Sequence, residues 1–341
     1  MSAVLKPGTY AGTAPGSLPK RSWRPWILAA LWAPVVTFAV WALFFDNAKL
    51  FLLTTLNGIT LAALYFVVAA GFTLVFGLMK NVNLAHGSLY LLGAYVGYFV
   101  GDKSGSWLLA VAAGFAAAAF VGLLLQVAIF RFMPGEDLRQ TLVTIGISII
   151  IADVFLWVFG AEVHQFDPPR WIFGSVPFPL VDRYPTYRLA LLAMAVVLGV
   201  ALWIFLQRTR VGMMIRAGVD DRAMLAASGV NVQLVFAITF AIGGGLAGFG
   251  GVVGATALSI SPGEDTRYLL ASLMVVIIGG MGSIPGAAVG ALLIALAEQY
   301  GVAYAPTYGV VFQFLILVLA LAFRPQGILG NAWTAGAKAG K

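Results

Sequence analysis

The chain has 341 residues, of which 61% are hydrophobic and only 10% are charged, and its mean hydropathy is +0.96. Soluble globular domains usually contain about 25% charged residues, so this composition excludes that class. The net charge of +7 indicates cationic loops that face anionic lipid, and no nucleic-acid partner is expected. The chain has no cysteine and two histidines, so no metal site is predicted.

The first 26 residues form a distinct N-terminal segment. They are rich in Gly, Pro and Ser, they contain no acidic residue, and they carry four basic residues, Lys6, Lys20, Arg21 and Arg24. This composition predicts a basic cytoplasmic tail over 1–26. An apolar stretch follows within 27–48, and no small-residue cleavage pattern precedes Asp46. We therefore interpret it as an additional N-terminal span in preference to a secretory signal peptide.

Apolar segments of span length continue along the whole chain. A helix needs about 20 apolar residues to cross the hydrocarbon core, and by that measure the sequence predicts an all-α polytopic transmembrane helix bundle with about 8–10 spans. The candidate spans are 27–45, 50–79, 82–100, 107–130, 140–160, 188–207, 232–259, a long block at 268–298, and 308–323. The run 241–257 holds seven glycines and is predicted to lie at the centre, where neighbouring helices can approach closely.

The distribution of basic residues orients these spans, because Lys and Arg concentrate in cytoplasmic loops. With the N-terminal tail inside, most internal basic residues fall on the same side: Lys80, Arg131, Arg139, Arg208, Arg210, Arg216 and Arg222. One crossing per segment would place the C-terminal tail, 331–341, outside. A break near 279–286 that turns the block 268–298 back on itself makes this tail cytoplasmic instead. Gly and Pro in the sequence GGMGSIPG favour such a break.

Polar residues and irregular backbone at membrane depth are candidates for function because both are costly in lipid. A broken helix there indicates a translocation path, although a packing kink is the alternative. The candidate path residues are Asn57, Asn83, His86, Gly87, Ser88, Gly282, Ser283, Pro285 and Gly286. Two carboxylates, Asp153 and Glu298, also lie within spans but toward their ends.

The segment 207–231 is the longest internal loop on the predicted cytoplasmic side. Val219, Ala223, Ala226 and Val230 recur at helical spacing, and Gly229 is placed to end that helix. The helix is too short and too polar to span a membrane. Lipid headgroups or another protein must therefore cover its apolar stripe.

Three sequence runs and the loop 207–231, in the same order along residues 50–330, resemble the signatures of the branched-chain amino-acid ABC transporter permease family. The three runs are GFTLVFGL at Gly71–Leu78, NLAHG at Asn83–Gly87 and GGMGSIPGA at Gly279–Ala287. The resemblance implies an integral permease domain over 49–330, preceded by an additional span. Many members carry a Lys near the position of Ala271, and this departure leaves the substrate open among branched-chain and other amino acids, amides and organic acids.

The resemblance also implies an assembly. The partners would be two ABC ATPase subunits that bind the ATP, a second and different permease subunit, and an extracytoplasmic substrate-binding protein, all at the inner membrane of a bacterial cell. The loop 161–187, which holds five of the fifteen prolines, is either a platform for a soluble partner or an inert connection. The loop 207–231 would dock on an ATPase through Arg210, Gly212, Arg216, Ala217, Asp220, Ala226 and Gly229.

Other function classes fit the sequence less well. The chain contains no Gly-x-x-x-x-Gly-Lys-Ser/Thr phosphate loop, so it is not expected to hydrolyse ATP alone. A gradient-driven secondary transporter of small solutes is the alternative, but its ion-coupling carboxylates would lie deeper than Asp153 and Glu298. Because no catalytic motif is present, we expect neither enzymatic activity nor a bound cofactor.

Overall fold

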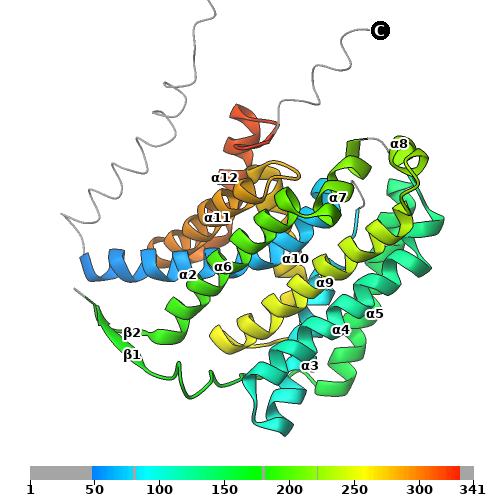
Figure 1. The fold of residues 1–341 in the computed structure, drawn as a ribbon. Helices are drawn as coiled ribbons and strands as arrows, with labels where there is room; N and C mark the ends of the chain where they lie inside the picture. Colours follow the sequence, from blue (N-terminus) through cyan, green and yellow to red (C-terminus); the bar gives the residue numbers. More distant parts are fainter. Residues whose placement is uncertain (1–47, 80–81, 179–180, 221, 331–341) are drawn as a thin grey trace, which may run out of the picture. The chain divides into compact units, whose positions relative to one another are not determined.

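The computed structural model describes residues 48–79, 82–178, 181–220 and 222–330 (Figure 1). The predicted basic tail, the predicted additional span and the predicted C-terminal tail lie outside these ranges, so they stay predictions. The 3-10 turns of the described part are Phe130–Phe132 and Pro306–Tyr308, and its long helices are α2 (Ala48–Phe72), α3 (His86–Ser104), α4 (Trp107–Ala128), α5 (Asp137–Phe159), α6 (Thr186–Arg208), α9 (Val232–Ala257), α10 (Glu264–Gly279), α11 (Ile284–Tyr304) and α12 (Gly309–Phe323).

These helices form the predicted all-α polytopic bundle. Seven helices in the described ranges are long and apolar enough to cross a membrane, namely α2 with the π-helical turn Thr73–Leu78 that continues it, α4, α5, α6, α9, α11 and α12 with its preceding turn. Together with α3 and α10, which pack among them, they give nine bundle helices in the described part of the chain.

Helix α9 lies at the centre of the bundle, as its glycines predict. It packs against α2, α3 and α4. A Cβ atom on Gly93 of α3 would overlap with the backbone of Gly248, and a Cβ atom on Gly248 would overlap with Gly114 of α4. Three helix backbones therefore meet where no side chain intervenes, which is how helices associate in lipid without a hydrophobic driving force.

The block 268–298 is broken and turns back on itself, as the predicted cytoplasmic position of the C-terminal tail requires. Helix α10 ends at Gly279, and α11 begins at Ile284. The two helices are antiparallel, because a Cβ atom on Gly290 would meet the carbonyl of Val275, and the backbones of Gly279 and Gly286 are in contact. The break is therefore the turn of a helical hairpin, which we call the α10–α11 hairpin.

The physical cause of this break differs from the expected one. Gly280 and Gly282 have φ angles of 100° and 78°, which favour glycine, and Ser283 caps α11 by accepting a hydrogen bond from the Gly286 N–H at 3.1 Å. Pro285 lies in the first turn of α11, where a missing N–H is tolerated. The glycines make the turn, and the proline only starts the next helix.

Two other features were not predicted. Helix α3 begins at His86 and not at residue 82, because Asn83 Oδ1 accepts a hydrogen bond from the Ala85 N–H at 3.1 Å and holds a turn there. The loop after α5 contains an antiparallel hairpin of β1 (Ser175–Phe178) and β2 (Val181–Pro185).

The β hairpin is anchored to the first half of α2. The Tyr184 hydroxyl donates to the Leu56 carbonyl at 3.0 Å, and Lys49 Nζ donates to Asp182 Oδ2 at 2.7 Å. The hydrogen bond from Lys49 holds the pKa of Asp182 below its ordinary value. This end of the bundle is therefore closed by a small ordered sheet.

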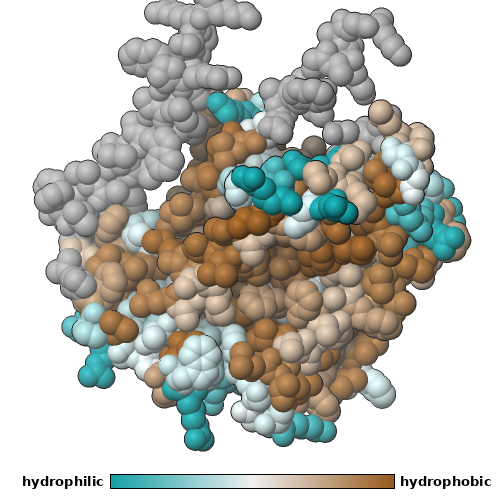
Figure 2. Space-filling view, in the orientation of Figure 1, coloured by the Kyte–Doolittle hydropathy of each residue, from teal (hydrophilic) through white to brown (hydrophobic). Residues whose placement is uncertain are grey.

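The surface agrees with a membrane location. Figure 2 shows an apolar band across the face in view, with hydrophilic residues gathered near α7 (Arg210–Asp220) and near the β hairpin. Helices α5 and α12 expose most of their apolar side chains. An exposed apolar area of this extent has to be covered by lipid or by other subunits.

Candidate functional site

The predicted docking loop contains two short helices, α7 and α8 (Arg222–Ala227), and α7 is fixed to the end of α6. Thr209 Oγ1 accepts a hydrogen bond from the Gly212 N–H at 3.0 Å, and a Cβ atom on Gly212 would overlap with the carbonyls of Phe205 and Leu206. Arg216 Nη1 donates to Gln207 Oε1 at 2.8 Å. The glycine, the cap and the arginine thus hold α7 rigidly against α6.

The single helix predicted around Val219–Val230 is wrong, because the chain bends between α7 and α8. A Cβ atom on Gly218 would lie 3.1 Å from Leu225 Cδ2. Residues seven apart in one straight helix are separated by about 10 Å along its axis, so this contact requires the bend. Gly229 follows α8 with a φ of 81°, as predicted for a residue that ends the helix.

The outer side of α7 and α8 presents a mixed apolar and basic surface. Ile215 and Gly218 point inward and are buried. The exposed residues of this surface, which we call the α7–α8 surface, are Arg210, Met213, Ala217, Met224, Ala226 and Gly229. Four of the seven predicted docking residues are therefore exposed, whereas Gly212 is buried, Arg216 is half-buried, and the side chain of Asp220 lies outside the described part.

The turn of the α10–α11 hairpin is covered by protein on two sides. A Cβ atom on Gly77 would overlap with Gly282, and the N–H groups of Ile328 and Leu329 donate to the carbonyls of Ile278 and Gly279 at 2.7 and 3.0 Å. Two of the carbonyls that the end of α10 leaves free are thus satisfied. Gly282, Ser283 and Gly286 lie in this packed turn.

A second group of predicted path residues lies at the start of α3. His86 is fully buried, and its Nε2 lies 3.0 Å from the Val68 carbonyl oxygen. Ser88 Oγ is hydrogen-bonded to Ser148 Oγ at 2.7 Å. His86 Nδ1 and Asn83 Nδ2 are buried with no hydrogen-bond partner among the described residues.

The structure does not bring all the predicted path residues together. A Cβ atom on Gly87 would overlap with the carbonyl of Asp265, at the start of α10, whereas Gly282 follows the end of α10. The 16 residues of α10, about 24 Å at 1.5 Å per residue, separate the two groups. Asn57 lies elsewhere, where it accepts a hydrogen bond from Arg188.

A group of charged residues between α2, α10 and α11 was missed by the sequence analysis. Glu298 accepts hydrogen bonds from the Tyr65 hydroxyl at 2.7 Å and from Arg267 Nη2 at 2.9 Å, and Arg267 Nη1 lies 3.5 Å from Glu264 Oε2. We call Tyr65, Glu264, Arg267 and Glu298 the Glu298 cluster. The sequence contained a signal for it: in a hairpin centred between 279 and 286, residue 267 lies opposite residue 298.

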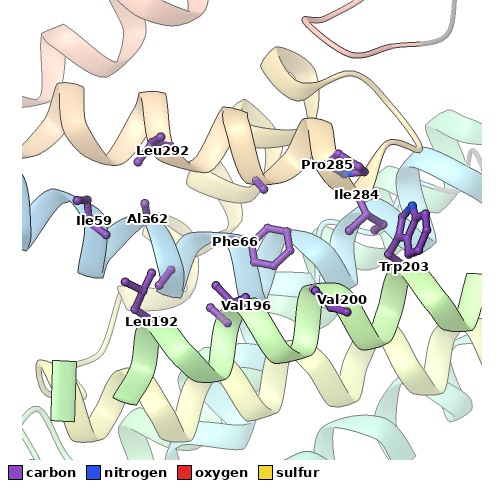
Figure 3. Close-up of a pocket in the computed structure, with 14 residues that line it drawn as sticks. Ile59, Ala62, Phe66, Leu192, Val196, Val200, Trp203, Ile284, Pro285 and Leu292 are labelled. Atoms are coloured by element: carbon purple, nitrogen blue, oxygen red, sulfur yellow. The ribbon is translucent and has the colours of Figure 1, made fainter. Parts of the chain in front are cut away.

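An apolar groove of about 460 Å³ lies between α2, α6 and α11 (Figure 3). Phe66, Val196, Val200 and Leu292 lie along it, and Pro285 lies at one end. Its lining is almost entirely apolar, with the indole of Trp203 as the exception, so the groove offers little hydrogen bonding to a polar solute. Pro285 therefore faces an apolar groove, which is a poor surface for the predicted path.

The helix bundle and its apolar surface define a multi-pass membrane protein. Comparison with known proteins gives the family: a family model described as branched-chain amino acid transport system / permease component matches residues 54–321. The chain belongs to this family, as its resemblance predicted. The gradient-driven transporter is therefore not the favoured assignment.

Individual relatives align over most of their length. The chain is 32% identical to the high-affinity branched-chain amino acid transport system permease protein LivH of Salmonella typhimurium, over 82% of this chain and 96% of LivH. It is 30% identical to BraD of Pseudomonas aeruginosa, which has the same description, over 81% and 94% of the two chains. The ribose import permease protein RbsC of Escherichia coli is 28% identical over 67% and 71%. No solved structure matches the chain.

Proposed function

We propose that this chain is the permease subunit of an ATP-driven ABC importer for branched-chain or related amino acids in the inner membrane of a bacterial cell. Two ABC ATPase subunits would bind the ATP, a second and different permease subunit would complete the membrane domain, and an extracytoplasmic binding protein would deliver the solute. The observation that supports this proposal best is the exposed α7–α8 surface on a helix that is rigidly joined to α6.

The packing around α7 supplies a route by which ATPase motion could reach the membrane domain. Helix α7 contacts α6, α9 and the π-helical turn Thr73–Leu78. The same turn contacts the α10–α11 hairpin through Gly77 and Gly282. π-helical turns inside α-helices often mark functional sites. A displacement of α7 would therefore act on the packed turn of the hairpin through the end of α2.

The proposal is tested by purifying the tagged chain from its native membrane in a mild detergent. We expect two kinds of partner to remain bound, ATPase subunits and a second permease, and we expect the preparation to hydrolyse ATP. Uptake of leucine by proteoliposomes that contain the complex and its binding protein then tests the substrate class, with ribose as the competing candidate. A chain that purifies alone, without ATPase activity, contradicts the proposal.

A cap substitution tests whether the hairpin turn takes part in transport. Ser283→Ala removes the cap of α11, and Ser106→Ala removes the equivalent cap of α4, where Ser106 Oγ accepts from the Leu109 N–H at 3.4 Å. Each change should cost about 1 kcal/mol of stability. We expect leucine uptake to fall severalfold in Ser283→Ala and to stay normal in Ser106→Ala. Thermal unfolding of both variants is measured alongside, to show that their losses of stability are similar. Equal leucine uptake by the two variants would mean that the hairpin turn serves packing and not transport.

A further inference from the structure

The Glu298 cluster joins two candidate spans, α2 and α11, to the first turn of α10. Tyr65 is near the middle of the 30-residue span Ala48–Gly77, which is about 45 Å long at 1.5 Å per residue. Tyr65 and Glu298 are both buried, and their hydrogen bond joins α2 to α11. Ionised side chains within membrane spans are expensive, so they persist where they pair with each other or line a path for solutes.

One side of the cluster is open. The Arg267 side chain is 41% exposed and the Glu264 side chain is 23% exposed, whereas the Glu298 side chain is only 12% exposed. A guanidinium group does not face hydrocarbon, so its open side has to meet water or another polar surface.

The charges of the cluster match a solute that carries both signs. Two carboxylates and one guanidinium give the cluster a net negative charge, which attracts a cation, while Arg267 attracts an anion. A guanidinium has five N–H donors, and Arg267 contacts one carboxylate through Nη1 and one through Nη2. Its contact with Glu264, at 3.5 Å, is long, so Glu264 can exchange this contact for another cation.

The aromatic residues behind the cluster hold it in place. The Tyr65 and Tyr268 rings are 5.7 Å apart in an edge-to-face contact, and the Tyr268 and Tyr90 rings stack with centroids 3.8 Å apart. The Arg267 guanidinium carbon lies 6.0 Å from the Tyr268 ring centroid. These packed rings fix the backbone of α10 on the buried side, so the guanidinium keeps its orientation toward the open side.

We propose that the open side of the Glu298 cluster is a binding site for the zwitterionic head of the transported amino acid. The solute carboxylate binds the remaining N–H groups of Arg267, and the solute ammonium group binds Glu264, while Tyr65 and Glu298 hold Arg267 in position. This inference rests on the proposed function and adds to it the group that this chain recognises and the residues that recognise it.

The absence of cysteine from the chain allows a direct test. Leu270 is 43% exposed and lies one helical turn after Arg267 on the same face of α10, so Leu270→Cys places a single thiol beside the site. The rate of thiol modification by a small methanethiosulfonate reagent is measured on the assembled complex in proteoliposomes. Leucine at millimolar concentration should slow this rate at least fivefold. Val302→Cys, at a site that is 51% exposed on α11, is the control and should be unaffected.

Two analogues separate the two charges of the solute. 3-Methylbutylamine lacks the carboxylate and 4-methylpentanoate lacks the ammonium group, and each should slow the modification less than twofold. Arg267→Gln or Glu264→Gln should remove the protection by leucine, whereas Glu136→Gln, in an exposed ion pair with Arg139, should keep it. In the cysteine-free chain, Arg267→Gln should lower leucine uptake at least tenfold with the ATPase subunits still bound.

The outcomes distinguish this inference from the proposed function. Equal protection by leucine and by the singly charged analogues, or no protection at all in a complex that takes up leucine, overturns the zwitterion site and leaves the permease assignment intact. Normal leucine uptake by Arg267→Gln overturns it as well. A chain that carries no ATPase subunit overturns the proposed function itself.

Discussion

Met213→Glu is expected to abolish leucine uptake while the chain remains folded in the membrane. Met213 is 51% exposed at the α7–α8 surface, between Arg210 and Ala217. A carboxylate in the centre of an apolar contact must lose its hydration when a partner docks, and such central residues contribute about 2 kcal/mol or more to binding. Docking of the ATPase should therefore weaken by about thirtyfold or more, measured as the amount that co-purifies with the tagged chain.

The matched control is an apolar residue elsewhere on the predicted cytoplasmic side. Leu138 is 74% exposed in the first turn of α5, where an added Glu is favourable to the helix dipole. We expect Leu138→Glu to keep both the bound ATPase and the uptake. If the two variants lose uptake equally, the effect is not specific to α7, and the docking surface lies elsewhere.

Gly248→Leu is expected to prevent folding of the bundle, in contrast to Met213→Glu. Gly248 lies where the backbones of α3, α4 and α9 meet, and even a Cβ atom there would overlap with Gly114 and Ala118. Overpacking a well-packed core usually costs about 1–3 kcal/mol of stability. Because three backbones must separate here, we expect a cost at the upper end of that range or above it. The measurement is the fraction of detergent-solubilised chain that remains monodisperse, together with its thermal unfolding temperature.

Gly146 supplies the control for this effect. It lies within α5, and apart from its own stretch of helix no protein atom lies within 4 Å of the position where its Cβ atom would be. Gly146→Leu should therefore leave the unfolding temperature unchanged or raise it slightly, since Gly is a weak helix former. A similar drop in the unfolding temperature of both variants would show that the membrane, and not backbone contact, limits the size of the side chain at these two positions.

The features of the fold that could be predicted from the sequence are those that depend on hydropathy and on the positions of glycine. The span pattern, the central position of 241–257 and the turn at 279–286 follow from apolar length and from the conformational freedom of glycine, which act locally. Contacts between distant segments were not predicted. The β hairpin depends on Tyr184 and Asp182 reaching α2, and the late start of α3 depends on one hydrogen bond from the Ala85 N–H to the Asn83 side chain.

The same distinction applies to the candidate site. The docking residues could be proposed because they lie near one another in one loop of the sequence, and they stay a prediction, whereas the bend between α7 and α8 was not predicted. The Glu298 cluster was missed because Arg267 lies just before the candidate block 268–298 and Glu298 was considered without a partner. Only the antiparallel packing of α10 and α11 brings the two side chains within 2.9 Å. A single sequence shows each charge but not the pairing that makes it tolerable in lipid.

The hydrogen bonds from Ile328 and Leu329 to the end of α10 have a consequence for biosynthesis. The ribosome makes Ile278 and Gly279 long before it makes the two residues that satisfy their carbonyl groups. During that interval these two carbonyl groups lack their partners in the finished chain, so water or other groups have to satisfy them. The hairpin therefore reaches its final packing only when the segment after α12 has emerged, so a ribosome stalled before Ile328 would expose an unfinished site to membrane proteases.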